Sequence, residues 1–171
     1  EIKVNDGYIS MNIHHFHDET NQKTYIFNSV ENEKNAFIQM YDFHHKAIIR
    51  TFHTERYSTK IELYNDSSNS LIIVYTDFKG NLRQCYAESG KVIKEVNLGK
   101  ACFDFLVWDE DYFIVCGDNT DNSFKIVYKD SLQVVKTYAN NHNGIIINIG
   151  VFLVGDEKFL VTYGADRKIN I

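Results

Sequence analysis

The segment Ala47–Phe52, with the sequence AIIRTF, recurs twice further along the chain. Its copies are KVIKEV over Lys91–Val96 and QVVKTY over Gln133–Tyr138, at offsets of 44 and 42 residues. Each copy follows a segment rich in β-branched and aromatic residues that ends in a polar turn, and three more such runs follow it. These residue types favour β-strands. The sequence therefore predicts a repeated unit of four short strands.

The composition of the chain agrees with a single β-rich domain. Of its 171 residues, 44% are hydrophobic and 14% are aromatic, which is enough to form a packed core. Proline is absent, so Gly, Asn, Asp and Ser must form the turns. No stretch of about 12 residues keeps its apolar side chains at helical spacing, so we expect no long helix. Short strands at this density are typical of sandwiches, barrels and propellers.

The charge and cysteine content exclude several classes of function. The chain has 18 basic and 23 acidic residues, a net charge of −5, whereas nucleic-acid binding requires clustered Lys and Arg. No run approaches the roughly 20 apolar residues that span a bilayer. The three cysteines have neither disulfide-framework nor zinc-motif spacing, which favours a reducing compartment. We therefore expect an intracellular, cytoplasmic protein without membrane insertion or a nucleic-acid partner.

Because the chain begins at Glu1 without a signal-peptide pattern, we expect it to be part of a longer protein.

The stretch Ile38–Phe52 resembles the end of a WD repeat, the unit of one family of β-propellers. It contains alternating hydrophobic residues, the aromatic–acidic pair Tyr41-Asp42, a turn and a return strand. By spacing, Cys85-Tyr86 and Val127-Tyr128 hold the same place in the next units without the Trp-Asp signature of the family. A period of about 40–45 residues with four strands is that of a WD-type blade.

The last repeat carries the most complete resemblance. Asn141-His142 is similar to the Gly-His pair of the family. In such repeats a His, a Ser or Thr, an Asp and a Trp form a buried chain of hydrogen bonds. The resemblance assigns His142, Thr162 and Asp166 to it here, with the Trp position just past Ile171. Glu55 and Lys100 stand where two other units would carry the His.

The resemblance implies an all-β propeller of the WD-repeat type with about four four-stranded blades. The blades would cover approximately residues 1–45, 46–90, 91–131 and 132–171, beginning with a remnant strand at Glu1–Asn5. The first strand of each later unit would be the outer edge strand of the blade before it. Rings of this family commonly have seven or eight blades, so the remaining blades are expected in the same or another chain.

Two expectations about packing follow from the assignment of blades. On each inner strand at least one alternating set of apolar residues should be buried. One set of alternate positions contains Phe103, Phe105, Ile145 and Ile147, whereas Ile146 and Phe152 lie on others. The faces of the terminal blades should be apolar and uncovered, so residues 1–171 alone should aggregate or pair through them. The residues expected there are Phe16, Ile26 and Ile38 at one end, and Ile169 and Ile171 at the other.

His14, His15 and His17 are the most conspicuous candidates for chemistry. On a strand, His15 and His17 point to the same face, and two imidazoles at that spacing can share a zinc or copper ion. A third ligand would be needed, for which His44 or His45 is the nearest candidate. The alternative interpretation is a polar, exposed end of a strand. We favour this alternative and predict no metal site.

Other reactive residues are expected to be structural. Asp109, Glu110 and Asp111 lie between two β runs, which favours a solvated turn over paired catalytic carboxylates. The neighbouring Trp108 is either a surface anchor or part of the core. Cys85, Cys102 and Cys116 lie in strand-like runs and are expected to be buried, unreactive thiols. No glycine-rich phosphate loop or nucleophile elbow is present. We therefore predict no catalytic or cofactor-binding residues and no cofactor.

The favoured function is a non-enzymatic scaffold for protein–protein interaction, within a larger protein or multiprotein complex. The resemblance implies this, because WD-repeat proteins mostly bind other proteins through loops and the grooves between blades. The alternative is a propeller enzyme or metal-binding module that uses His14, His15 and His17. A module that binds RNA or phosphoinositide through a basic face is less favoured because of the net charge of −5.

Overall fold

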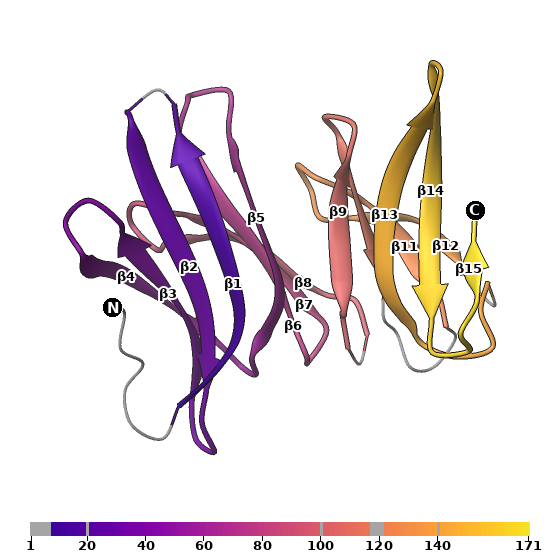
Figure 1. The fold of residues 1–171 in the computed structure, drawn as a ribbon, viewed down its shortest axis with the longest axis horizontal. Coiled ribbons are helices and arrows are strands. Elements are labelled where there is room, and N and C mark those ends of the chain that lie inside the picture. Colours follow the sequence, from indigo (N-terminus) through magenta and orange to yellow (C-terminus); the bar gives the residue numbers. More distant parts are fainter. Residues whose placement is uncertain (1–7, 20, 100, 117–121, 140) are drawn as a thin grey trace. The chain divides into compact units, whose positions relative to one another are not determined.

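The computed structural model describes residues 8–19, 21–99, 101–116, 122–139 and 141–171. Within these residues there are fifteen β-strands and no helix, so the prediction of an all-β fold is confirmed. The strands form four antiparallel sheets, each built from consecutive strands that pair in chain order (Figure 1). No helix that could cross a membrane is present in the described part of the chain.

The first two sheets have four strands each. The first sheet contains β1 (Ile9–Asp18), β2 (Lys23–Glu31), β3 (Ala36–Asp42) and β4 (Ala47–Thr54). The second sheet contains β5 (Ser58–Asn65), β6 (Leu71–Asp77), β7 (Asn81–Tyr86) and β8 (Val92–Asn97).

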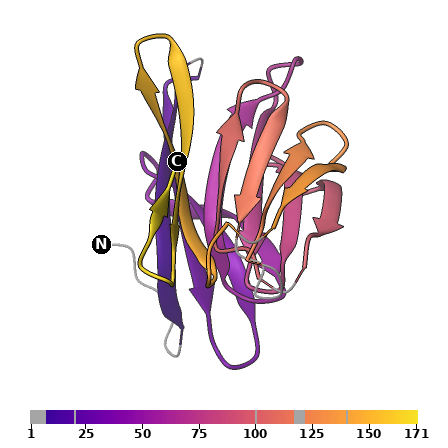
Figure 2. The same cartoon turned by 90° about the vertical axis from the view of Figure 1, so that its right-hand side faces the viewer.

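The third sheet has four strands and the fourth has three among the described residues. The third sheet contains β9 (Asp104–Trp108), β10 (Tyr112–Cys116), β11 (Phe124–Tyr128) and β12 (Val134–Tyr138). The fourth sheet contains β13 (Ile146–Val154), β14 (Glu157–Gly164) and β15 (Ile169–Asn170). Figure 2 shows the long β13–β14 hairpin with the short β15 beside β14.

The repeated sequence segment forms the fourth strand of each of the first three sheets. These strands are β4, β8 and β12, and each lies at a sheet edge. The residue just before each copy has a left-handed backbone, with φ of 53° at Lys46, 72° at Gly90 and 56° at Leu132. The backbone N–H groups of Gly90 and Leu132 donate to the carbonyls of Tyr86 and Tyr128, at 2.8 and 2.9 Å. The sequence repeat is therefore also a repeat of backbone geometry.

The described residues separate into two compact units. The first contains residues up to Phe78 together with Arg83–Lys94, and the second contains Lys79–Leu82 and Glu95–Ile171. Each unit has its own apolar core, and the two are described separately below.

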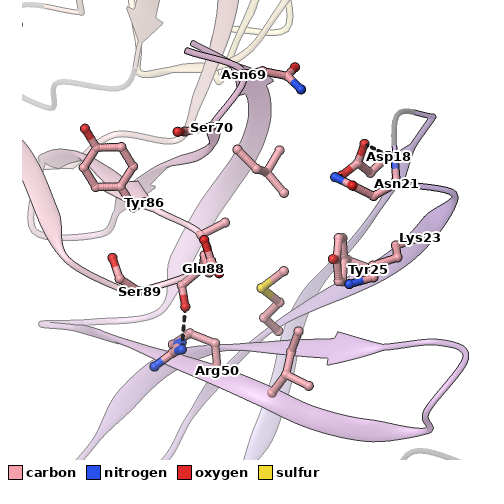
Figure 3. Close-up of a pocket in the computed structure, with 14 residues that line it drawn as sticks. Asp18, Asn21, Lys23, Tyr25, Arg50, Asn69, Ser70, Tyr86, Glu88 and Ser89 are labelled. Carbon is pink, nitrogen blue, oxygen red and sulfur yellow. Dashed lines mark hydrogen bonds between the residues drawn. The ribbon is translucent and has the colours of Figure 1, made fainter.

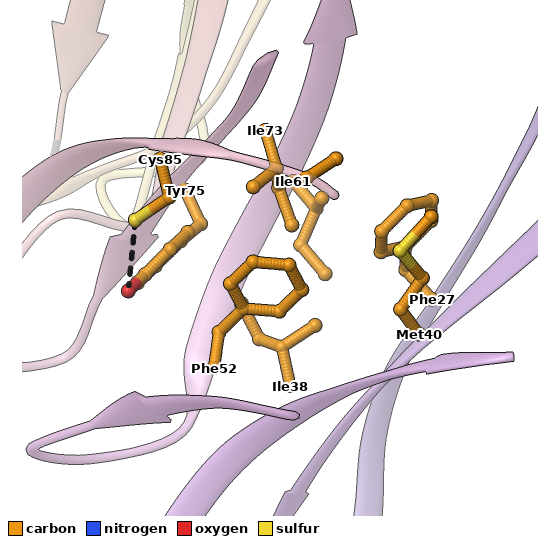
Figure 4. Close-up of a cluster of buried hydrophobic side chains, with 9 residues drawn as sticks. Phe27, Ile38, Met40, Phe52, Ile61, Ile73, Tyr75 and Cys85 are labelled. Atoms are coloured by element: carbon orange, nitrogen blue, oxygen red, sulfur yellow. Dashed lines mark hydrogen bonds between the residues drawn. The ribbon is translucent and has the colours of Figure 1, made fainter. Parts of the chain in front are cut away.

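The core of the first unit lies between one face of the first sheet and one face of the second (Figure 4). Cross-strand neighbours share this face: Phe27 is opposite Met40, and Ile38 is opposite Phe52. The buried members are Phe27, Ile38, Met40, Phe52, Ile61, Ile73, Tyr75, Cys85 and Ala87. Burying a side chain such as Phe27 contributes about 1.5–3 kcal/mol. This packing is the main source of stability visible in the unit.

This core corrects the expected composition of the first terminal face. Ile38 is 0% exposed, because its side chain points with Phe52 into the core rather than away from it. Phe16 and Ile26 are half-buried. The strongly exposed apolar side chains of β1 are instead Ile9 and Ile13, at 67% and 66%.

The core of the second unit is smaller and joins the third and fourth sheets. It contains Ile114, Cys116, Ile146 and Ile149, with Leu106, Trp108, Phe124 and Leu160 packed against it. On β9 the expected burial is confirmed at Phe105, and Phe103 is half-buried just before this strand.

On β13 the buried residues do not follow the simple alternation. Ile146 and Ile149 are buried, whereas Ile147 and Phe152 are 41% and 37% exposed. A register shift between Ile146 and Asn148 interrupts the two-residue period of this strand. Ile145 precedes the strand and is half-buried.

Candidate functional site

The histidines at 14, 15 and 17 lie on β1, and the structure does not complete a metal site around them. His15 and His17 are exposed on one side of the strand as predicted, and His14 is half-buried on the other. Burial, together with Lys60 and His15, lowers the pKa of His14. His17 Nδ1 lies 3.0 Å from the hydroxyl of Thr24 on β2.

The proposed third ligands belong to a different local structure. His44 and His45 lie in the β3–β4 turn, where the Nδ1 atom of His45 is 2.8 Å from the carboxylate of Asp42. In the described part of the chain, no group of three or more His, Cys, Asp or Glu side chains could hold a metal ion.

The acidic stretch Asp109–Asp111 forms the exposed turn between β9 and β10, as the sequence predicts. Asp109 accepts a hydrogen bond from Lys158 Nζ at 2.7 Å. The same ammonium lies 4.2 Å from the centre of the Trp108 ring, which packs against the core. Trp108 is therefore a partly buried structural residue rather than an exposed anchor.

All three cysteines are free and buried. Burial raises the pKa of the Cys116 thiol, so it is held in the unreactive form. The prediction of buried thiols is confirmed, with one correction to their placement: Cys102 lies before β9 and not within a strand.

His142, Thr162 and Asp166 form the hydrogen-bond chain that the resemblance implied. His142 Nδ1 donates to the Asp166 carboxylate at 2.9 Å, and Nε2 lies 2.9 Å from the Thr162 hydroxyl. The side chain of His142 is fully buried, and Thr162 is 4% exposed. The chain of contacts ties the segment before β13 to the middle of β14 and to the β14–β15 turn. Thr162 also borders a groove of the second unit, but the His142 side chain is fully buried, so the trio acts as a structural device.

Asp166 is also the centre of a backbone cap. Its carboxylate accepts the N–H groups of Asn143 and Lys168 at 2.9 and 3.1 Å. Burial opposes ionisation of Asp166, but the hydrogen bonds from Asn143, His142 and Lys168 outweigh it and lower its pKa to about 2. Asp42 holds the β3–β4 turn in a similar way. Hydrogen bonds from His45 and His44 lower the pKa of Asp42 to about 2.

These two carboxylates predict a loss of stability in acid. Both have an ordinary pKa of 3.8 and a folded-state pKa of about 2, so the folded chain binds fewer protons than the unfolded chain between these values. Their contribution is therefore complete above about pH 4 and is lost as the pH falls towards about 2. Melting temperatures measured across this range should fall, and Asp166→Asn should make the decline shallower. An acid-independent melting temperature of the parent would contradict the prediction.

In two other units, a different residue occupies the position at which the resemblance expects His. Glu55 is exposed and lies 3.7 Å from Arg83, which also pairs with the fully buried Asp77 at 3.2 Å. A buried ion pair thus stands in the second sheet, and a His–Thr–Asp chain in the fourth. Lys100 and the remnant strand at Glu1–Asn5 lie outside the described residues.

A groove of about 570 Å³ in the first unit is the best-formed candidate binding site (Figure 3). It lies between the first and second sheets, and its floor is formed by Met40, Leu71 and Ala87. Its rim is polar and comes from several separate segments. The rim residues include Asp18, Asn21, Lys23, Tyr25, Arg50, Asn69, Ser70, Tyr86, Glu88 and Ser89. A concave site with an apolar floor and a few polar groups is typical of ligand binding.

Arg50 links the two sides of this groove. It lies on β4, and its Nη2 atom donates to the backbone carbonyl of Glu88 in the β7–β8 turn. Its Nε atom is buried without a hydrogen-bond partner in the described structure. Sequence reasoning missed this residue as a site candidate. The available signal was its place in the repeated segment, where all three copies carry Arg or Lys.

A second groove, of about 460 Å³, lies in the second unit and is mainly apolar. Aromatic and aliphatic residues dominate its lining, which includes Trp108, Ile114, Phe124 and Leu160. Its one ammonium group, on Lys158, is held by Asp109 and the Trp108 ring. This groove therefore offers fewer unengaged polar groups than the groove of the first unit.

Comparison with known proteins supports the fold alone. No protein-family model and no curated protein matches the chain. Among solved structures, the chain is similar to the crystal structure of the computationally designed Ika4 protein, with a TM-score of 0.63 and 12% sequence identity. The match covers 85% of this chain and 82% of that chain. At this identity, the likeness supports the arrangement of the strands and carries no information about function.

Proposed function

We propose that the chain is part of a WD-type β-propeller that serves as a non-enzymatic scaffold for binding other proteins. The observation that carries the propeller assignment is the hydrogen-bonded trio of His142, Thr162 and Asp166. A buried polar network of this kind is stabilising only when its members are satisfied, so its assembly at the positions implied by the resemblance is specific support. The succession of four-stranded meanders, each ending in the repeated segment, agrees with blades.

The binding role is supported by a comparison of the reactive side chains with the groove of the first unit. The carboxylates of the β9–β10 turn are solvated, the thiols are buried, and the β1 histidines have no third partner in the described structure. The groove of the first unit, in contrast, is open and has an apolar floor with a polar rim. Such a surface recognises a partner by shape and hydrogen bonding without requiring a catalytic group. The three free cysteines support a reducing, cytoplasmic location.

Affinity capture tests this proposal. Tagged residues 1–171 are used as bait in an extract of the native source, and the bound proteins are quantified by mass spectrometry. We expect defined proteins to be retained in reproducible proportion, and equally well by the Lys94→Gln variant, whose exposed side chain lies outside the groove. Recovery of chaperones alone, or hydrolytic activity associated with the pure chain, would contradict a scaffold function.

A further inference from the structure

Several side chains of the groove in the first unit can donate hydrogen bonds to a ligand. In the described structure no carboxylate lies within ion-pair distance of Lys23 or Arg50, and the only hydrogen bond of Arg50 goes to a backbone carbonyl. The hydroxyl groups of Tyr25, Tyr86 and Ser70 also line the groove, and none of them contacts a side-chain partner among the described residues. These groups can all donate to a ligand.

The two carboxylates of the groove differ in availability. Asp18 is 7% exposed, and it accepts hydrogen bonds from the N–H and the Nδ2 atom of Asn21 at 3.2 and 2.8 Å. Glu88 is exposed on the rim, where its side chain can turn to solvent. Burial, together with the charges of Asp18, Asp42 and Glu88, raises the pKa of Tyr25, so its hydroxyl remains a donor at neutral pH.

We propose that this groove binds an acidic segment of a partner protein, with one carboxylate held by Arg50, a second by Lys23, and an adjacent apolar side chain on the floor of Met40, Leu71 and Ala87. This inference rests on the proposed scaffold function and names the chemistry of the partner. Arg50 is half-buried without a carboxylate partner, so an incoming carboxylate gains a charge-assisted hydrogen bond in a partly desolvated place. Figure 3 shows Arg50 at the bottom, beneath Glu88, and Lys23 at the right, beside Tyr25.

The lining favours a peptide over a nucleic acid. A phosphate backbone carries a negative charge at every nucleotide, and the groove has only two basic residues to compensate. A peptide can place one carboxylate at each of the two basic residues and apolar side chains on the floor. The volume of about 570 Å³ accommodates a few side chains, which agrees with a short segment.

A titration followed by nuclear magnetic resonance tests the inference directly. The probes are two capped hexapeptides, Gly-Leu-Glu-Leu-Glu-Gly and Gly-Leu-Gln-Leu-Gln-Gly. They are added to isotope-labelled residues 1–171 carrying Tyr163→Asp and Ile169→Asp, two changes in the other unit that are expected to keep the chain monomeric. We expect the acidic peptide to shift the amide resonances of residues 69–71 and 87–90. The neutral peptide should bind about tenfold more weakly, because it lacks the charge-assisted hydrogen bonds.

Three variants separate charge recognition from structural effects. Lys23→Gln changes an exposed side chain and should weaken binding of the acidic peptide severalfold while leaving the spectrum folded. Arg50→Lys keeps a charge at the β4 position without the planar guanidinium and should also weaken it. Lys94→Gln is the matched control, because Lys94 holds the same place as Arg50 in the next copy of the repeat and lies outside the groove.

Equal binding of the two peptides, no binding of either, or shifts confined to other surfaces would overturn the inference. The proposed scaffold function fails separately. If affinity capture retains the same proteins with wild type and Lys23→Gln while the acidic peptide does not bind, the groove assignment is wrong and the scaffold function stands. If capture retains no defined protein but the acidic peptide binds the groove, the groove assignment stands and the scaffold function is wrong.

Discussion

Replacing His142 with alanine is expected to lower the free energy of unfolding of the second unit by about 2–4 kcal/mol. The imidazole is fully buried and bridges Thr162 and Asp166 with two contacts of 2.9 Å. Its removal leaves a cavity, a buried hydroxyl without its partner and a carboxylate with one hydrogen bond fewer. Urea unfolding followed by tryptophan fluorescence measures the change, because the single Trp108 packs against the core of this unit.

Gly164 offers a second way to disturb the same network without removing any of its members. A Cβ atom at this position would lie 2.5 Å from His142 Nδ1 and 2.8 Å from the Asp166 carboxylate, closer than atoms approach without displacement. Gly164→Ala should therefore destabilise the unit and be non-additive with His142→Ala, because the alanine at 142 removes the clash with the imidazole and leaves only the one with Asp166.

The pair of His45 and Asp42 supplies the matched control. Its Nδ1–carboxylate distance of 2.8 Å is close to that of the buried pair, but 74% of the His45 side chain is exposed. Exposed ion pairs contribute little, so His45→Ala should cost about 1 kcal/mol or less. Equal effects of the two substitutions would show that burial does not determine the contribution of the network.

The strand order could be predicted from the sequence because it depends on local signals. The copies of AIIRTF have β-branched residues next to polar turns, and each forms the fourth strand of a sheet. The trio of His142, Thr162 and Asp166 could be predicted from the resemblance, since it belongs to one repeat and depends on one hairpin and its adjoining turns.

The groove could not be predicted because its residues come from two sheets. Lys23, Arg50 and Ser89 are far apart in sequence and meet only when the sheets pack. The repeat itself gives no help here, since Arg50 and Lys94 hold equivalent positions and only Arg50 lines the groove. Similarly, alternation groups Ile38 with Met40 on one face but does not say which face is covered.

The expected behaviour of the chain in isolation is self-association through the outer face of the fourth sheet. Leu160 and Thr162 point to the core side of β14, so the alternate residues Phe159 and Tyr163 point away from it. On this outer face Tyr163 is opposite Ile169, and they are 43% and 65% exposed. Phe152 stacks on Phe159 with a centroid distance of 5.3 Å.

Such an uncovered apolar face is unfavourable in water and promotes association. Burying each large apolar side chain contributes about 1.5–3 kcal/mol, so changing Tyr163 and Ile169 together to aspartate should weaken association at least about a hundredfold. Sedimentation velocity at several protein concentrations measures this effect. The wild-type chain should sediment as dimers or larger species, and the double variant as a monomer.

Val92→Asp and Val135→Asp control for the loss of exposed apolar surface in general. These side chains are 48% and 49% exposed, similar to Tyr163, but lie on the edge strands β8 and β12. They should leave the association unchanged, because they are not part of the outer face of the fourth sheet. A wild-type chain that remains a monodisperse, cooperatively melting monomer would show that this exposed face does not drive association. It would favour a self-contained β fold over part of an open ring.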